Sequence, residues 1–214
     1  MNPRSRNLLV AAAVLVVALA IAAVAFAGGG DDDSDVASGG ATGTASGPTL
    51  QQYQAVDITG TPLGQFASSA DDPAIGKAVP ELTGHSFDGT AVHIRNDGRP
   101  KLVLFLAHWC PHCRAEVPVV RDWLDAGNGT NLDVYAVSTN ATADRPNWPP
   151  SKWLEDENWP TPVLVDDRQS VAASAYGLTS FPYFVFVNSD GTVALRGSGE
   201  VPAAQLTQMA SRVK

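Results

Sequence analysis

The sequence predicts an α/β protein in which a central mixed sheet is flanked by helices and preceded by an N-terminal transmembrane or signal helix. Three observations lead to this prediction. Apolar runs of strand length alternate with segments of helical length along most of the chain. Two cysteines, separated by two residues, closely follow an apolar run. Twenty consecutive apolar residues, 8–27, lie close to the N-terminus.

The N-terminal apolar segment follows Arg4 and Arg6 and precedes a group of aspartates. At a rise of about 1.5 Å per residue, a helix of this length spans roughly 30 Å, the thickness of a bilayer core. Positive charge before the segment predicts that the N-terminus is cytoplasmic and that everything downstream lies outside. We therefore expect residues 1–27 to form a transmembrane anchor. The alternative is a secretory signal that is cleaved near Ala27.

The rest of the chain divides by composition at about residue 73. Residues 28–73 are rich in Gly, Ser, Ala and Thr, and such a composition buries too little apolar surface to offset the entropy of ordering. We expect them to form a flexible tether. Residues 74–214 carry the strand and helix patterns, and we expect one folded domain there.

The charge balance excludes one class of partner. The chain has 214 residues, of which 14 are Lys or Arg and 22 are Asp or Glu, so its net charge is −8. It contains no basic cluster of the kind that binds a phosphate backbone. Nucleic acid is therefore not an expected partner.

The first half of the domain is predicted to contain a hairpin, a strand, a helix and another strand. Residues 80–95 contain stretches of alternating apolar and polar residues on either side of Asp88-Gly89, a dipeptide that favours tight hairpin turns. The apolar run at 101–107 is typical of a strand that is buried on both faces. A helix is expected at 110–126 and an apolar strand at 132–137. A strand, a helix and a strand in this order form a parallel unit.

The second half of the domain begins with a proline-rich insert, which we expect to surround a short helix. The remaining elements follow from apolar runs and the turns between them. The expected elements are a helix at 151–156, a strand at 163–165, a helix at 170–176, a hairpin of strands at 183–187 and 193–196, and a last helix at 203–213.

The chemistry is concentrated at Cys110 and Cys113, at the start of the first predicted helix. The unpaired N–H groups and the dipole at a helix N-terminus favour a thiolate, so we expect Cys110 to be the attacking sulfur. Cys113, one turn further along, is placed to resolve a mixed disulfide. Pro111 suits an early helical position, where its missing N–H costs nothing. A protonated His112 would place a positive charge beside the thiolate and stabilise it further.

The same thiols could instead bind a metal ion. A copper or zinc metallochaperone would combine Cys110 and Cys113 with His108 and His112. A structural zinc site needs four ligands, and beyond the cysteines the chain offers only four scattered histidines. We therefore expect redox chemistry, with no metal site and no cofactor other than the redox-active disulfide between Cys110 and Cys113.

Four stretches of the chain carry a resemblance to a known family: VPELTGHSFDGTAVHI, KLVLFLAHWCPHC, RAEVP and FPYFVFVNSDGTV. Through them, residues 79–213 resemble the thioredoxin-like fold, and specifically the membrane-tethered extracytoplasmic thiol–disulfide oxidoreductases of the TlpA/ResA/DsbE type. A Cys-x-x-Cys pair alone would be a weak signal. The downstream proline and hairpin make the combination specific.

The resemblance implies roles for four more residues. Pro182 matches the family's cis-proline, which packs against the cysteine pair and docks an extended substrate segment, and Phe181 precedes it in the substrate contact. Trp109 matches the aromatic residue before the nucleophile and is a further substrate contact. Glu116 matches the acidic residue that ResA-like members use as a proton acceptor near the sulfurs. The alternative is that Glu116 is a solvated residue in the first turns of a helix.

Two departures from related proteins bear on the direction of the reaction. Leu104 stands where thioredoxin itself has a buried aspartate, so Glu116 is the nearby carboxylate candidate. The Pro-His dipeptide between the cysteines resembles that of the strong oxidant DsbA, whereas the tethered family includes reducing members. We expect the protein to oxidise substrate thiols. The alternative is a reductase of extracytoplasmic disulfides, of the kind that serves apocytochrome c maturation.

The apolar segment and the resemblance together predict a location and partners. We expect the domain to lie outside the cytoplasm, anchored in the membrane by residues 8–27. The expected partners are thiols or disulfides of extracytoplasmic proteins, and a membrane redox partner that recharges the cysteine pair.

Overall fold

The computed structural model describes residues 49–214. The predicted anchor at residues 8–27 and the first part of the predicted tether lie outside these residues. Between residues 49 and 214, no helix combines the length and the apolar character that crossing a bilayer requires.

The described residues form four helices and eight strands, and each predicted element is confirmed with its ends shifted by no more than three residues. One strand near the start, β1, was not predicted. The helices are α1 (Pro111–Asp125), α2 (Pro150–Asp156), α3 (Val171–Ala175) and α4 (Ala203–Ala210). The strands are β1 (Asp57–Thr59), β2 (Glu81–His85), β3 (Ala91–Ile94), β4 (Lys101–Leu106), β5 (Asp133–Ser138), β6 (Val163–Val165), β7 (Tyr183–Val187) and β8 (Val193–Ser198).

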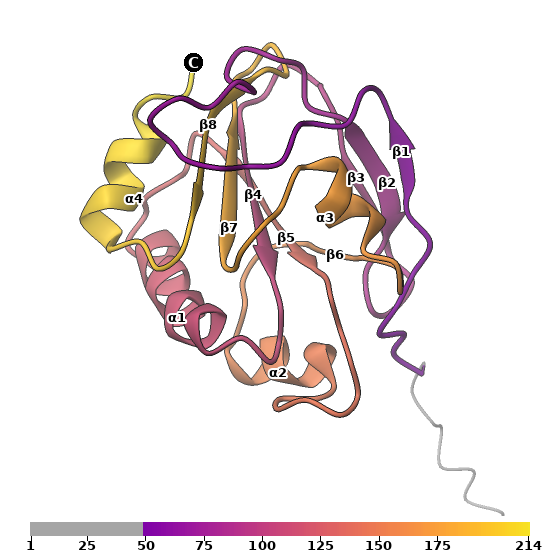
Figure 1. Cartoon of the computed structure of the whole chain (residues 1–214). Helices are drawn as coiled ribbons and strands as arrows, with labels where there is room; N and C mark the ends of the chain where they lie inside the picture. The colour runs from indigo at the N-terminus through magenta and orange to yellow at the C-terminus, as the bar shows by residue number, and fades with distance from the viewer. Residues whose placement is uncertain (1–48) are drawn as a thin grey trace, which may run out of the picture. The chain divides into compact units, whose positions relative to one another are not determined.

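A five-stranded mixed sheet forms the centre of the domain (Figure 1). Its strands lie in the order β6, β5, β4, β7 and β8. The first three of these are parallel to one another, while β7 is antiparallel to β4 and β8 is antiparallel to β7. The prediction of a mixed sheet is therefore confirmed.

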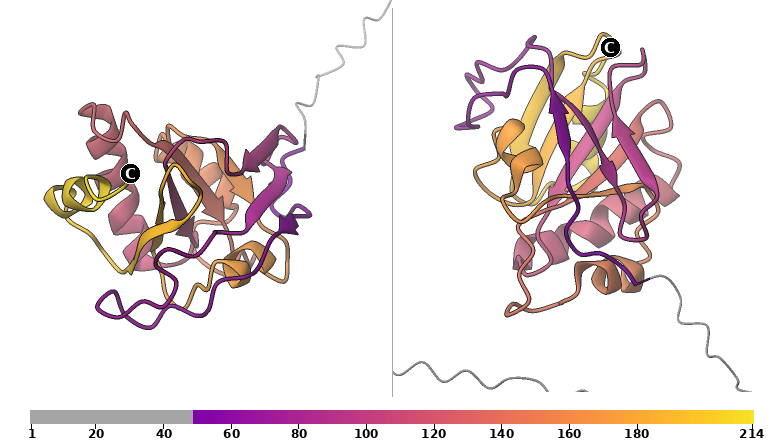
Figure 2. Two further views of the ribbon diagram at one scale, coloured as in Figure 1. Left: turned by 90° about the horizontal axis from the view of Figure 1, so that it is seen from above. Right: turned by 90° about the vertical axis from the view of Figure 1, so that its right-hand side faces the viewer.

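Side chains alternate along β4, and this alternation explains why helices cover both faces of the sheet. Leu102, Leu104 and Leu106 belong to the core cluster that contains residues of α1 and α4. Val103 and Phe105 belong to the other cluster, which contains residues of α3. Successive residues of a strand point to opposite faces, so an uninterrupted apolar run requires cover on both. Figure 2 shows α1 and α4 on one side of the sheet and α3 on the other.

A smaller antiparallel sheet contains β1, β2 and β3 and packs on the same side as α3. The predicted hairpin forms its β2 and β3, which are joined by the turn at Asp88 and Gly89. Gly89 has a φ of +86°, a conformation that glycine adopts at no steric cost. Thr90 N–H donates to the Asp88 carboxylate at 2.9 Å, which fixes the turn.

Residues 49–73 differ from the expected flexible tether, because they pack against the domain. Leu63 and Phe66 are buried, and their N–H groups donate to the carbonyls of Ala175 and Gly177, each at 2.8 Å. Only glycine fits at position 177, because a Cβ there would lie 2.2 Å from the Gly64 carbonyl oxygen. A few spaced apolar side chains thus dock a segment whose average composition is that of a linker.

A buried ion pair fastens the same segment to β8. The Arg196 guanidinium donates to the two carboxylate oxygens of Asp72 at 2.7 and 2.5 Å, and both side chains are almost completely buried. Burial is the largest single influence on Asp72 and by itself would raise its pKa. The hydrogen bonds from Arg196 and from Ala74 N–H, together with the positive charges of Arg196 and Lys77, outweigh it and leave that pKa lowered. Arg196 also donates to the carbonyls of Gly64 and Tyr176.

Candidate active site

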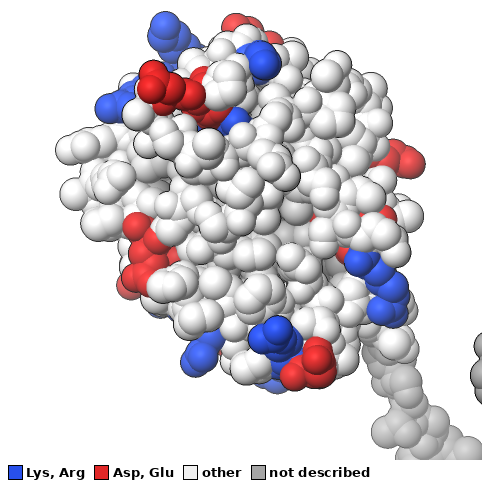
Figure 3. All heavy atoms as spheres, in the orientation of Figure 1, with Lys and Arg blue, Asp and Glu red and all other residues white. Residues whose placement is uncertain are grey.

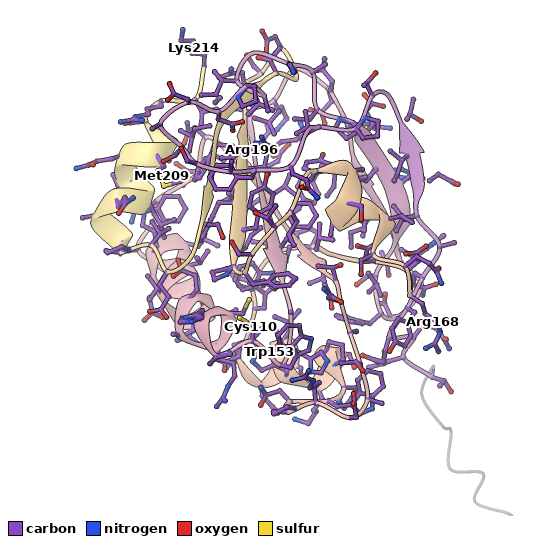
Figure 4. The ribbon with its side chains drawn as sticks, viewed as in Figure 1. Cys110, Trp153, Arg168, Arg196, Met209 and Lys214 are labelled. Carbon is purple, nitrogen blue, oxygen red and sulfur yellow. The ribbon has the colours of Figure 1, made fainter. Side chains whose placement is uncertain are left out.

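Cys110 lies at the carboxyl end of β4, where α1 begins (Figure 4). It is the N-cap residue of α1, with an extended backbone conformation, and Pro111 follows in the first turn. Its N–H donates to the Ala107 carbonyl at 3.0 Å, and its own carbonyl accepts from Arg114 N–H at 3.1 Å. These hydrogen bonds fix Cys110 at the boundary between strand and helix, as the sequence predicts.

The start of α1 presents a favourable environment for a negative charge. No side chain of the described residues caps its first N–H groups, and no acidic residue lies in its first turn. The N-terminus of a helix carries partial positive charge, and a thiolate at the N-cap is therefore stabilised by the helix. This is the position that Cys110 occupies.

Cys113 lies one turn inside the helix and differs from Cys110 in its access to solvent. Its side chain is fully buried, whereas Cys110 retains 6% exposure. Burial raises the pKa of Cys113, although Ala107 N–H donates a long hydrogen bond of 3.5 Å to its sulfur. The pair therefore combines a sulfur at the helix N-terminus, in a residue that retains slight exposure, with a fully buried sulfur that is favoured as thiol.

Glu116 lies one further turn along α1 and is not solvated, which removes the alternative considered from the sequence. Only 1% of this residue is exposed. Val201 N–H donates to its Oε2 at 2.9 Å, while its buried Oε1 has no hydrogen-bond partner among residues 49–214. Burial raises the pKa of Glu116 to about 7, partly opposed by the Val201 hydrogen bond and reinforced by the charge of Glu200. The carboxyl can therefore gain and lose a proton near neutral pH.

The bond between Phe181 and Pro182 is cis, which confirms the conformation expected there. The Pro182 carbonyl accepts a hydrogen bond of 2.9 Å from Gly199 N–H. Phe181 contacts Trp109 edge to face, with ring centroids 5.9 Å apart. Trp109 is held in turn by a hydrogen bond of 2.8 Å from its indole N–H to the Asn140 carbonyl. Trp109 and Phe181 therefore lie together and pack against the core cluster that contains Cys110 and Cys113.

His112 does not stand alone beside Cys110, because Glu200 pairs with it. Glu200 Oε1 lies 2.6 Å from His112 Nδ1, and both side chains are more than half exposed. Sequence reasoning missed Glu200, which is 88 residues away in a loop and belongs to no motif. The loop at 199–202 thus contacts Pro182, His112 and Glu116 through three successive residues.

His108 is unavailable as a metal ligand, and this corrects the ligand set of the metallochaperone alternative. Thr142 N–H donates to Nε2 at 3.2 Å, so this nitrogen is an acceptor. Nδ1 must then carry the proton, which it donates to the Pro146 carbonyl at 2.7 Å. Burial lowers the pKa of His108 and keeps the ring neutral. Both ring nitrogens are used within the protein.

A hollow of about 630 Å³ opens beside the cis-proline loop. The cis-proline loop, the start of α1, the end of β8 with its following loop, and the docked N-terminal segment supply its walls. Its lining residues include His112, Ser180, Phe181, Ser198, Glu200 and Phe66. An extended chain that approaches Cys110 from this side would meet Phe181 and the Glu200 and His112 pair.

Comparisons with known proteins agree with this geometry. The sequence pattern of the AhpC/TSA family matches residues 75–196. Methylamine utilization protein MauD of Methylobacillus flagellatus is 26% identical over 128 residues, which are 58% of this chain and 58% of that protein. Thiol:disulfide interchange protein DsbE of Escherichia coli K12 is 26% identical over 151 residues, 65% of this chain and 77% of that protein. The chain thus spans less than two thirds of MauD.

A solved structure supports the fold. The crystal structure of a DsbF homologue from Corynebacterium diphtheriae superposes with a TM-score of 0.56 at 18% sequence identity. The superposition covers 71% of this chain and 99% of that one. At 18% identity, this similarity shows a shared fold and carries no statement about activity.

Proposed function

Because this chain belongs to the AhpC/TSA family, we propose that it is a protein thiol–disulfide oxidoreductase that oxidises the thiols of extracytoplasmic proteins. The expected likeness to the TlpA/ResA/DsbE class is confirmed by the relatives described above. The observation that carries the proposal is the asymmetry of the cysteine pair. Cys110 lies at an uncapped helix N-terminus, and Cys113 is a fully buried thiol.

The reaction exchanges one disulfide for another. A substrate thiolate attacks the sulfur of Cys110, the bond to Cys113 breaks, and Cys113 leaves as a thiolate that takes up a proton. A second substrate thiolate then attacks the substrate sulfur of the mixed disulfide and releases Cys110 as a thiolate. Two electrons pass from the substrate dithiol to the cysteine pair. Stabilising the Cys110 thiolate stabilises the reduced protein, and this favours the oxidising direction.

Glu116 supplies the proton chemistry that the buried Cys113 needs. The raised pKa of Cys113 makes its thiolate a strong base on release and its thiol a poor nucleophile in the reverse step. A carboxyl group with a pKa of about 7, three residues away on the same helix, can donate or accept that proton. We assign this role to Glu116.

Glu116→Gln is expected to slow the attack of Cys113 on a mixed disulfide at Cys110 about 100-fold, because a neutral amide accepts no proton. In the wild type this rate should rise as the pH passes about 7, where Glu116 ionises. The variant should lose this rise. Stopped-flow measurement of glutathione release from the Cys110 adduct between pH 5 and 9 provides the test.

A stability measurement separates this effect from damage to the fold. Because the pKa of Glu116 is raised in the folded protein, ionisation of this carboxyl opposes folding. Protonated Glu116 therefore contributes fully to the stability of the protein at a pH below the pKa of an ordinary glutamate. This contribution is lost as the pH rises through about 7. Glu116→Gln should remove that decline without unfolding the protein. A variant that keeps the wild-type pH profile of release would exclude Glu116 as the proton acceptor.

The pair of His112 and Glu200 limits how strongly the histidine can act. An imidazolium beside Cys110 favours the thiolate, but a carboxylate 2.6 Å away neutralises much of that charge. The exposure of both side chains weakens the interaction further. We therefore assign to His112 a modest contribution to oxidising strength.

Glu200→Gln is expected to raise the equilibrium constant for oxidation of glutathione by the protein about threefold, because it removes the carboxylate charge that lies 2.6 Å from His112. The same substitution should have little effect in a His112→Ala background. The measurement is equilibration with glutathione buffers, scored by alkylation of free thiols. An equal shift in the two backgrounds would show that Glu200 acts through its own charge and not through His112.

The proposed location and partners follow from the sequence. We place the domain outside the cytoplasm, anchored by residues 8–27, with extracytoplasmic protein thiols as substrates and a membrane redox partner that recharges the pair. Fractionation of cells should leave the full-length chain with membranes after a high-salt wash. Release of a chain that begins near Gly28 would instead identify a cleaved signal.

The proposed function is tested by the direction of electron flow. Oxidised full-length protein is mixed with reduced, unfolded ribonuclease A, and in parallel the reduced protein is mixed with insulin. Loss of free thiols from ribonuclease A at substoichiometric protein, with a chemical oxidant to recharge the pair, is the expected result. Rapid reduction of insulin without oxidation of ribonuclease A would establish the reductase alternative.

A further inference from the structure

The strand β8 leaves one edge of the central sheet open. In the part of the chain that the structure describes, it is the last strand of the sheet, and its one neighbour there is β7. Gly199 N–H donates to the Pro182 carbonyl, so that pair of residues is of the hydrogen-bonded type. Hydrogen-bonded and non-hydrogen-bonded residue pairs alternate along two antiparallel strands. Gly197, two residues before Gly199, therefore also turns its backbone groups toward β7, while Arg196 and Ser198 turn theirs away from it.

Another segment covers only the start of this edge. Gly76 N–H donates to the Val193 carbonyl at 2.9 Å, and Val193 N–H donates to the Lys77 carbonyl at 2.8 Å. Within residues 49–214, no segment pairs with the backbone of Arg196 or Ser198 on the outer side. Arg196 itself is almost completely buried, so the accessible part of the edge is the end of β8 at Gly197 and Ser198, nearest to the loop at 199–202.

A groove runs along this open edge. It has a volume of about 700 Å³, which is within the ordinary range for a ligand site, and it lies between the docked N-terminal segment and α4. Phe66 and Ile75 line one wall, and Gln205, Gln208 and Met209 line the other. Figure 4 labels Met209 on α4 and Arg196 on β8, and both residues line the groove.

The groove leads to the candidate active site. It shares Phe66, Ser198 and Glu200 with the hollow beside Phe181 and His112. A chain lying along β8 would therefore continue into the hollow at the cis-proline loop. The charged side chains on this side of the molecule lie mostly toward its rim, and the centre is largely uncharged (Figure 3).

We propose that the open edge of β8 binds an extended segment of the substrate polypeptide, which pairs with it as an additional β-strand. The inference rests on the proposed function, and it names the form of the substrate as an unfolded chain. An edge strand recognises such a chain through main-chain hydrogen bonds, whatever its sequence. Apart from Arg196, Glu200 and Arg212, the residues that line the groove carry no charge, so it admits neutral side chains. The continuity with the hollow brings a cysteine further along the chain to Cys110.

The test uses a peptide without cysteine, so that binding is measured apart from exchange chemistry. The probe is a fluorescent decapeptide of alternating threonine and valine, and its matched control is N-methylated at every second residue. Full-length protein is titrated against each, with fluorescence anisotropy as the readout. The wild type should bind the unmodified peptide at least tenfold more tightly than the N-methylated control, because N-methylation removes the N–H donors along one edge of the extended peptide.

Two protein variants locate the contact. Ser198→Pro removes an outward N–H, and Ser198→Ala is its control because it loses only the hydroxyl, which bonds to Ser180. Gln205→Trp fills the groove from α4, and Ala203→Trp is its control because Ala203 does not line the groove. Ser198→Pro and Gln205→Trp should each weaken binding about tenfold relative to their controls.

The outcomes separate the two proposals. Equal binding by Ser198→Pro and Ser198→Ala, together with equal binding by the two tryptophan variants, would overturn the edge proposal, and so would the absence of binding to the wild type. A wild-type dimer that Ser198→Pro dissociates would show that a second copy occupies the edge, which also overturns it. Peptide binding without oxidation of reduced ribonuclease A would refute the proposed function and leave the binding edge intact.

Discussion

Replacement of Cys113 by serine is expected to leave the protein covalently attached to its substrates, whereas replacement of Cys110 leaves nothing attached. The reason is the difference in access: Cys110 lies at the helix N-terminus with some exposure, and Cys113 is completely buried. Without Cys113, a mixed disulfide at Cys110 has lost the neighbouring thiol that resolves it at high effective concentration. Its lifetime should therefore increase by several orders of magnitude, on the order of 1,000-fold or more.

The measurement is non-reducing electrophoresis of alkylated cell extracts that contain either single variant. Bands that disappear on reduction should accompany Cys113→Ser and be absent with Cys110→Ser. The double variant is the control for non-specific attachment. Equal trapping by both single variants would show that the two sulfurs are equally accessible and would contradict the assignment.

Loss of Arg196 is expected to have the largest effect on stability. Arg196→Met leaves the Asp72 carboxylate buried without its partner and removes the hydrogen bonds to the Gly64 and Tyr176 carbonyls. Breaking a buried pair from one side costs about 3–5 kcal/mol. Urea denaturation of the variant provides the measurement. The double variant Arg196→Met with Asp72→Asn should recover part of the loss, because it removes the isolated charge.

A surface pair is the matched control for this effect. Arg99 pairs with Asp133 at 2.6 Å, but 61% of the Arg99 side chain is exposed. Arg99→Met should therefore change stability little, since water solvates both charges in the absence of the pair. A similar loss in Arg99→Met and Arg196→Met would show that the buried pair has no special role in fastening residues 63–74.

The pH dependence of stability gives the same pair a second signature. The pKa of Asp72 is lowered in the folded protein, so the ionised carboxylate contributes to stability at a pH above the pKa of an ordinary aspartate. This contribution is lost as the pH falls through the lower pKa of the folded state. The wild type should lose stability more steeply than Arg196→Met in this acidic window. Parallel acid-denaturation curves would contradict the account.

Local patterns in the sequence were sufficient for most of the fold and for the centre of the site. The uninterrupted apolar run at residues 102–106 identifies a strand covered on both faces, because each side chain there must find an apolar neighbour. Cys110 and Pro111 indicate the start of a helix through their order alone. Pro182 opens an apolar strand, where a proline is tolerated. These inferences need only neighbours in the chain.

The features that the sequence did not reveal depend on contacts between distant residues. Asp72 and Arg196 are 124 residues apart, and neither stands in a pattern that predicts a buried charge. Glu200 is an ordinary loop residue until the fold brings it to His112. The segment at 49–73 has the composition of a linker, and its few apolar residues find sites that exist only in the assembled domain.

The reduction potential of the Cys110 and Cys113 pair tests the central claim most directly. The potentials that bracket the expected value are about −270 mV for thioredoxin and about −120 mV for DsbA. Equilibration of the full-length protein with glutathione buffers of known ratio should give a value between these two, because the helix N-terminus favours the Cys110 thiolate while Glu200 limits the effect of His112. A potential at or below that of thioredoxin would contradict the oxidising function and establish a reductase in its place.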